Sequence, residues 1–169
     1  MSGGVSFRSV NLREDLRDPR RLAHYHPTRR SVSVVRSVLE SGSRMVIAAY
    51  GSGKSLAAGV GAVMVTNDAA ATLKPVIDRL GAIDPDLAIL ADRRAKSLAK
   101  GLVIVLSGHI RDLPGALCEA IGARKAKSID GTLDGIESLG KIDHVAVIWD
   151  EFGRHLEGIV NEGRSRDLD

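Results

Sequence analysis

The stretch RMVIAAYGSGKSLAAGV, residues 44–60, joins three unlike segments. Its first part, MVIAAY at 45–50, is a short and continuous apolar run, which predicts a strand buried in a parallel sheet. A turn rich in glycine follows, and KSLAAGVGAVMV at 54–65 predicts a helix of small residues. Gly59 and Gly61 lower the propensity of that helix but allow close packing against a sheet. The stretch therefore predicts a strand, a tight loop and a helix in succession.

A glycine loop between a strand and a helix is suited to binding phosphate groups. Successive backbone N–H groups of the loop can converge on an anion, and the helix that follows presents the positive end of its dipole. Glycine fits there because a Cβ would obstruct the approach of the backbone to the phosphate. The ammonium of Lys54 would reach the terminal phosphates, and the hydroxyl of Ser55 would ligate Mg²⁺. The alternative is a flexible turn before an ordinary helix.

The loop departs at one position from the full phosphate-loop pattern G-x-x-x-x-G-K-[ST]. That pattern has a glycine where this chain has Ala48. The residues of the cradle itself, 51–55, are all present. The departure therefore bears on how the chain enters the loop more than on the chemistry of the loop.

A second candidate site follows the apolar run HVAVIW at 144–149, which predicts another buried strand. Asp150 and Glu151 come directly after it, at the carboxyl edge where ligands bind in open α/β sheets. Asp150 would hold Mg²⁺ directly or through water, and Glu151 would orient and deprotonate the attacking water. The alternative is a strand end that simply reaches solvent.

Together the two motifs resemble the P-loop NTPase superfamily, specifically its branch with an added catalytic glutamate, which includes the AAA-type ATPases. The resemblance rests on AAYGSGKS at 48–55 and VAVIWDE at 145–151, and it covers most of residues 44–153. More narrowly, YGSGKS with DEFGRHLE is similar to large ATPases of prokaryotic anti-phage and restriction-like gene clusters. The resemblance implies a three-layer α/β fold with a mostly parallel sheet, and ATP hydrolysis that depends on Mg²⁺.

The resemblance also implies roles for individual residues. Catalysis would be carried by Glu151 and Lys54, and the metal would be held by Ser55 and Asp150. The residues implied to bind ATP are Tyr50, Gly51, Ser52, Gly53, Lys54, Ser55 and Leu56.

GTP is the competing nucleotide. DEFG at 150–153 also satisfies D-x-x-G, the GTPase pattern in which the amide of Gly153 would sense the γ-phosphate. A GTPase also needs a guanine-reading N-K-x-D segment, and the sequence has none. The direct succession of Asp150 and Glu151 favours ATP.

We expect the fold to be incomplete. In the glutamate-bearing branch, a later strand with a polar sensor residue inserts between the two motif strands, and residues 152–169 read as helix instead. The domain expected over 27–169 would then be the front part of a longer ATPase, or further chains or subunits would complete the sheet and the active site. Little stability and little unaided turnover are expected from it alone. The alternatives to an ATPase module are a nucleotide-binding switch or structural partner with negligible hydrolysis, and a small-molecule kinase.

Composition limits the remaining classes. The 169 residues hold 44% hydrophobic and 27% charged residues and one cysteine, with no apolar run long enough for a membrane span and no secretory signal. A cytoplasmic protein without membrane contact is expected. Residues 1–36 hold eight arginines against three acidic residues, so the basic excess lies at the N-terminus. Residues 1–26 are expected to be a basic, partly disordered arm, which either contacts nucleic acid or is solvated.

Elsewhere helices alternate with apolar runs, which is typical of a parallel α/β sheet. GLVIVLSG at 101–108 is the clearest strand, and His109 follows it, where it would face a nucleotide or lie in a turn. Pro75 is expected to break or kink a helix over 69–80. The other helices are expected over 31–42, 112–124 and 154–164, and Asp112 is expected to cap the second of these. Leu133, Ile136 and Leu139 share one face of a further segment.

Overall fold

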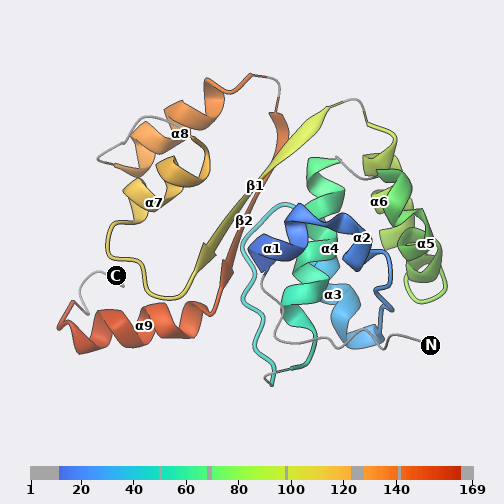
Figure 1. The fold of residues 1–169 in the computed structure, drawn as a ribbon, viewed down its shortest axis with the longest axis horizontal. Coiled ribbons are helices and arrows are strands. Elements are labelled where there is room, and N and C mark those ends of the chain that lie inside the picture. The colour runs from blue at the N-terminus through green and yellow to red at the C-terminus, as the bar shows by residue number, and fades with distance from the viewer. Residues whose placement is uncertain are drawn as a thin grey trace, which may run out of the picture. The chain divides into compact units, whose positions relative to one another are not determined.

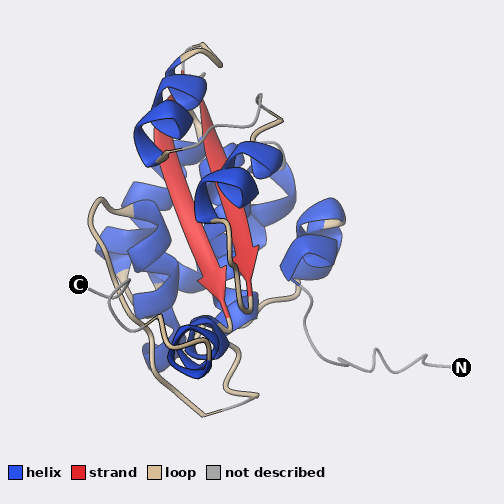
Figure 2. Cartoon of the chain, turned by 90° about the vertical axis from the view of Figure 1, so that its left-hand side faces the viewer, coloured by secondary structure: helices blue, strands red, loops and turns tan. Residues whose placement is uncertain are grey.

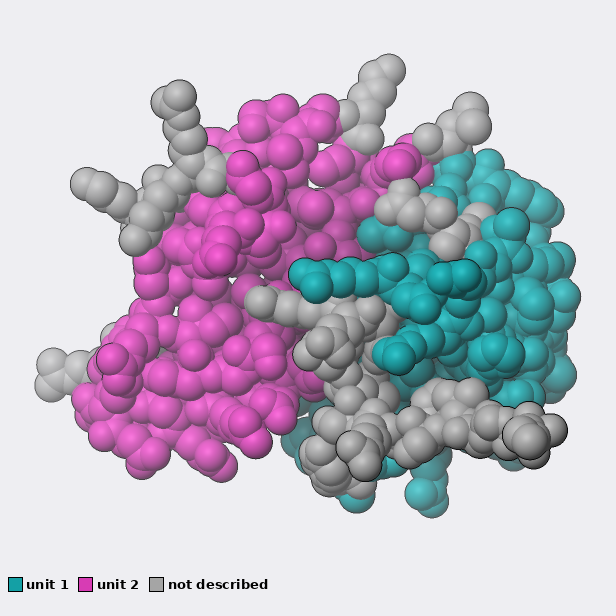
Figure 3. Space-filling model, viewed as in Figure 1, with its two compact units in different colours: residues 1–98 teal, residues 99–169 magenta. Residues whose placement is uncertain are grey.

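The computed structural model describes residues 12–49, 51–67, 70–97, 99–122, 128–140 and 142–164. The chain divides into two compact units, residues 1–98 (the first unit) and residues 99–169 (the second unit; Figure 3). Helices and a parallel sheet both occur, so the prediction of a mixed α/β protein is confirmed at that level.

Helix α4 (Lys54–Thr66) is the central element of the first unit. Every residue from Ala57 to Val65 is buried, because the helix has no charged side chain after Lys54 and therefore no polar face. The helices that contact α4 are α1 (Leu12–Arg17), α2 (Pro19–Leu22), α3 (Arg29–Leu39), α5 (Ala70–Gly81) and α6 (Pro85–Ala95).

The glycines of α4 make close packing possible, but their neighbours are helices. A Cβ on Gly61 would lie 2.8 Å from the Cβ of Val38 in α3, and a Cβ on Gly59 would lie 3.0 Å from Leu12 in α1. The sequence-based prediction that they pack against a sheet is therefore wrong. Small residues permit close approach of any backbone or side chain, so the pattern alone does not identify the partner.

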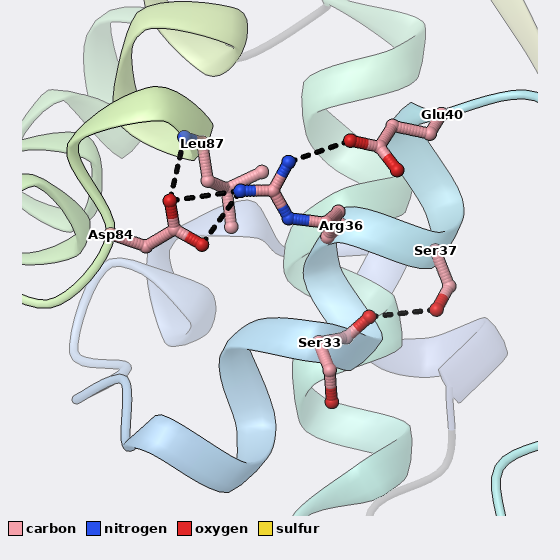
Figure 4. Close-up of polar contacts among 6 residues, drawn as sticks. All are labelled: Ser33, Arg36, Ser37, Glu40, Asp84 and Leu87. Atoms are coloured by element: carbon pink, nitrogen blue, oxygen red, sulfur yellow. Dashed lines mark hydrogen bonds and ion pairs between the residues drawn. The ribbon is translucent and has the colours of Figure 1, made fainter.

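An ion-pair network joins α3 to α6 (Figure 4). Arg36 donates from Nη2 to both carboxylate oxygens of Asp84, at 2.8 and 2.7 Å, and from Nη1 to Glu40 at 2.6 Å. Asp84 also caps α6 by accepting the backbone N–H of Leu87 at 3.0 Å. One carboxylate thus fixes the start of α6 and its contact with α3.

Part of the segment expected to be a loose arm is packed. Residues 12–17 and 19–22 are the helices α1 and α2, and Leu12, Leu22 and Tyr25 are buried. Leu12 and Leu22 lie against Gly59 of α4, which gives these apolar residues a partner. Residues 1–11 lie outside the described residues.

The segment predicted as the strand before the glycine loop is not a strand. Residues 43–49 form neither helix nor strand, and the side chains there are exposed, Met45 at 67% and Ile47 at 87%. A short apolar run becomes a strand only when a neighbouring strand bonds its backbone. The structure supplies no such pairing to these residues, so the prediction is corrected.

The second unit contains two parallel strands, β1 (Lys100–Ser107) and β2 (Ile142–Asp150), which lie side by side (Figure 2). The strands predicted at 101–108 and 144–149 are confirmed, and their register pairs Ile104 with Val147 and Ser107 with Asp150. Helices α7 (Leu113–Ala120) and α8 (Ile129–Glu137) form the connection between the strands, and α9 (Phe152–Asn161) follows β2 (Figure 1).

The core of the second unit lies between β1 and α7. Ile104, Leu106 and Ile121 are its buried centre. Asp112 caps α7 by accepting the N–H of Gly115, as the sequence predicts. Partly buried side chains pack around the centre from Leu102, Ile110, Leu113, Ala116, Leu117, Ile136 and Trp149.

The other predicted helices also occur, with one difference. Helix α3 begins after Thr28, whose hydroxyl accepts the N–H of Ser31 at 3.2 Å, and α9 covers most of the helix expected over 154–164. Helix α5 continues through Pro75, which lies inside it. The helix therefore does not break at Pro75, and a kink there stays a prediction.

Candidate functional site

The glycine loop is curled by two residues in left-handed backbone conformation. Gly51 has φ 74° and Gly53 has φ 81°, a region that residues with a Cβ rarely adopt. The N–H of Ser52 donates to the carbonyl of Ala49 at 3.3 Å, which closes the turn. A Cβ on either glycine would meet no atom within 4 Å. The glycines are thus required by backbone conformation and not by crowding.

The ammonium of Lys54 folds back over this loop. Its Nζ donates to the carbonyls of Ala48 and Ala49, both at 2.9 Å, and lies 3.4 Å from the hydroxyl of Ser52. These acceptors are neutral, whereas a phosphate oxygen would form a stronger, charge-assisted hydrogen bond. The loop therefore holds the Lys54 ammonium against its own turn, where the ammonium could also bind an anion.

Helix α4 begins directly at Lys54, with Gly53 as its N-cap and no side-chain hydrogen bond to the cap. The first turn has no acidic residue, so the helix itself supplies no carboxylate there to offset the positive end of its dipole. Backbone N–H groups at the start of a helix need partners from outside the helix. The loop and the helix start together form a local environment suited to an anion.

The resemblance also implies that Tyr50 and Leu56 bind the nucleotide. Tyr50 lies outside the described residues. Leu56 is the third residue of α4 and is partly buried. Contact of either residue with a nucleotide stays a prediction.

The carboxylate pair lies at the end of β2, as predicted. Asp150 is the last residue of the strand, and its carbonyl accepts the N–H of Gly108 at 3.0 Å. Its Oδ1 accepts the backbone N–H of Glu151 at 3.1 Å. Since β1 and β2 are parallel, both end at this edge of the sheet.

Glu151 has an unusual backbone conformation, with φ 56° and ψ 36°. Such a conformation costs a residue with a Cβ about 1–3 kcal/mol and persists only where the surroundings enforce it. The Glu151 carboxylate is exposed, and its Oε2 lies 3.2 Å from Nη1 of Arg154. Strain of this kind clusters at functional sites, and no feature of the sequence predicted it.

Beside the carboxylates lies a group of rings that the sequence did not predict. His155 of α9 stacks near Trp149, with ring centroids 4.3 Å apart, and Phe152 meets Trp149 edge-on at 5.0 Å. Burial lowers the pKa of His155, and the nearby His109 and Arg164 lower it further. The sequence placed His109 at the end of a strand, but its partners are far away along the chain.

Glu162, just past the end of α9, completes this group. It accepts a hydrogen bond from Nε2 of His109 at 3.1 Å and forms an ion pair with Arg111 at 2.7 Å. The hydrogen bond from His109 is the main cause that holds the pKa of Glu162 below its ordinary value, and Arg111 adds to it while burial opposes it.

The structure thus brings the predicted residues together in two groups. Residues 51–55 form the loop and helix start in the first unit, and Asp150 and Glu151 form the strand tip in the second. The hydroxyl of Ser55 and the carboxylate of Asp150 are oxygen ligands, which suit Mg²⁺ where substrate phosphates and water supply its other ligands. Convergence of the two groups on one nucleotide stays a prediction.

Comparisons with family models, with curated proteins and with solved structures found no match for this chain. No helix within the described ranges is both long and apolar enough to cross a membrane.

Proposed function

We propose that this chain binds ATP with Mg²⁺ and hydrolyses it as the front part of a larger ATPase module. The observation that carries the proposal is the placement of the Lys54 ammonium over a loop curled by two left-handed glycines, at the start of a buried helix whose N-cap is a glycine. An ordinary flexible turn would not need this combination. Each part favours an anion, and together they favour the phosphates of a nucleotide.

The residues divide the chemistry between them. Lys54 and the loop amides bind the phosphates, and Ser55 and Asp150 hold Mg²⁺. When bound, Mg²⁺ neutralises charge on the phosphates as the terminal phosphate leaves. Glu151 orients the attacking water and accepts its proton, a role that suits a solvent-accessible carboxylate.

Exposed apolar side chains support a larger assembly. Met45, Val46 and Ile47 are exposed in the first unit, and Val145 and Val147 are exposed on β2 in the second. Strand-type residues of this kind are usually covered in a complete sheet. Further chain or further subunits would cover them, and hydrolysis would then be coupled to remodelling or assembly on nucleic acid or protein.

A nucleotide-binding switch with negligible hydrolysis is the second candidate. The ion pair between Glu151 and Arg154 favours it, because the carboxylate that would meet the attacking water is bound to a cation instead. The pair is largely exposed, however, and such pairs contribute little free energy. A bound water and nucleotide would compete with it readily.

The substitution Lys54→Ala tests phosphate binding. It removes a charge-assisted hydrogen bond, so we expect the affinity for Mg-ATP to fall by about 1.5–3 kcal/mol, measured by isothermal titration calorimetry. Lys74→Ala is the matched control, because Lys74 is exposed on α5 and pairs with Asp78. Equal affinity of the Lys54→Ala variant and the wild type would contradict the proposal.

A further inference from the structure

We propose that the loop 108–111 and α9 form a clamp that holds the turn at Asp150 and Glu151 and so positions the two carboxylates. The clamp consists of the contacts that Gly108, His109, Ile110 and Arg111 make with β2 and α9. Its structural part stands on geometry alone, and its effect on catalysis rests on the proposed function.

On the helix side, the clamp grips α9 at two levels. The backbone N–H of Ile110 donates to Nδ1 of His155 at 3.2 Å, in the first turn of the helix. Past its last turn, Glu162 accepts from His109 at 3.1 Å and from Nε of Arg111 at 2.7 Å. The loop therefore fixes both the position and the direction of α9.

On the strand side, the clamp grips the tip of β2. The N–H of Gly108 donates to the carbonyl of Asp150, and Nε1 of Trp149 donates to the carbonyl of Gly108, both at 3.0 Å. One residue of the loop thus holds two successive residues of the strand. Glu151 lies in the chain between the residues of β2 that Gly108 holds and the residues of α9 that the loop holds.

Glu151 needs such external support. It is the N-cap of α9, yet its side chain makes no capping hydrogen bond, and its backbone is left-handed. A residue in this conformation relaxes unless the elements on both sides are fixed. The clamp fixes β2 on one side and α9 on the other, which is the arrangement that the strained turn requires.

The fit of His109 against α9 is tight. A Cβ on Gly158 would lie 2.2 Å from Nδ1 of His109, so only glycine at that position lets the imidazole lie on the helix. Nδ1 itself is buried and has no hydrogen-bond partner within the described part of the chain. A buried nitrogen without a partner is unfavourable, and the hydrogen bond from Nε2 to Glu162 offsets part of this free energy.

Two substitutions open the clamp by different routes. Glu162→Ala removes the acceptor that His109 and Arg111 share, and Gly158→Ala displaces His109 although alanine favours helix formation. Glu157→Ala is the control for Glu162→Ala, because Glu157 is an exposed residue of the same helix. Amide hydrogen exchange of Gly108 and Glu151, followed by NMR on the whole chain without nucleotide, reports on the turn directly.

We expect exchange of both amides to rise at least about tenfold in the Glu162→Ala and Gly158→Ala variants and to stay unchanged in the control. We also expect kcat for Mg-ATP to fall about tenfold while the affinity for ATP measured without Mg²⁺ stays the same, because the carboxylates move and Lys54 does not.

Unchanged exchange in both variants would overturn the clamp whatever the hydrolysis rate. Faster exchange with full kcat would overturn its positioning role. A wild-type chain that binds Mg-ATP but does not hydrolyse it would instead contradict the proposed function, while the exchange result would still decide whether the clamp holds the turn.

Discussion

At the scale of the residue, Glu151 combines a costly backbone with an exposed carboxylate. Glycine would hold the same left-handed turn without the penalty that a Cβ brings. Among the described residues, the carboxylate forms an exposed ion pair with Arg154, and such a pair contributes little to stability. A residue that strains the backbone without a stabilising contact to offset the strain is typical of a functional position.

Two substitutions at Glu151 separate strain from chemistry. Glu151→Gly should leave the free energy of unfolding unchanged or raise it by up to about 1 kcal/mol, because relief of strain exceeds the entropy that glycine adds to the unfolded chain. Glu151→Gln keeps the strain. Both variants should lose about 10²- to 10⁴-fold in hydrolysis rate. Urea unfolding and phosphate release measure the two effects.

Each of the two predictions for Glu151 has an outcome that would contradict it. A Glu151→Gly variant markedly less stable than the wild type would show that the left-handed turn is not strained. Hydrolysis at the wild-type rate by Glu151→Gln would remove this residue as the base.

At the scale of the element, most helices and both strands of the sheet could be predicted because their signals are local. The continuous apolar runs in β1 and β2, the cap at Asp112 and the small-residue pattern of α4 all lie within a few residues. The run at 45–49 has the same local signal as β2. It forms no strand because pairing depends on partners elsewhere in the fold, which its own sequence does not specify.

The candidate site also has parts that a local sequence signal predicts and parts that it does not. The glycine loop, Lys54 and the acids after β2 follow from motifs with fixed spacing. The left-handed backbone of Glu151 and the hydrogen bond between Ile110 and His155 have no such motif. They depend on contacts between elements that are far apart along the chain. No periodicity or spacing predicts such contacts.

Gly61→Ala tests the packing of α4 on α3. The added Cβ would lie 2.8 Å from Val38, so the helices must separate, and overpacking of this kind costs about 1–3 kcal/mol in the free energy of unfolding. Gly81→Ala in α5 is the control, since its Cβ would lie an ordinary 3.6 Å from Ala88. Denaturant unfolding compares the two variants. Equal stability of both would contradict the close packing.

The pH dependence of stability tests the environment of His155. Burial lowers the pKa of this imidazole below its ordinary 6.5, so folding favours the neutral form. As pH falls through 6.5, the unfolded chain binds a proton that the folded chain resists, and stability decreases until the pH passes the folded pKa. His155→Gln should therefore lose less stability than the wild type between about pH 7 and pH 5.5 in urea unfolding. An equal or larger loss would contradict the inference.

At the scale of the whole molecule, each unit leaves apolar surface uncovered. Met45 and Ile47 are exposed in the first unit, and Val147 of β2 is 54% exposed in the second. Exposed residues of this size raise the free energy of the isolated chain by leaving apolar area in water. Cover from further chain or subunits fits the proposed larger module, and a single nucleotide-binding domain over 27–169 stays a prediction.

A crystal structure of the chain with Mg²⁺ and a non-hydrolysable ATP analogue tests the central claim most directly. We predict phosphates on the amides of residues 51–55 and on Lys54, Mg²⁺ between Ser55 and Asp150, and the Glu151 carboxylate facing the γ-phosphate. A nucleotide bound elsewhere, or one bound in the loop with Asp150 and Glu151 remote from it, would contradict the claim.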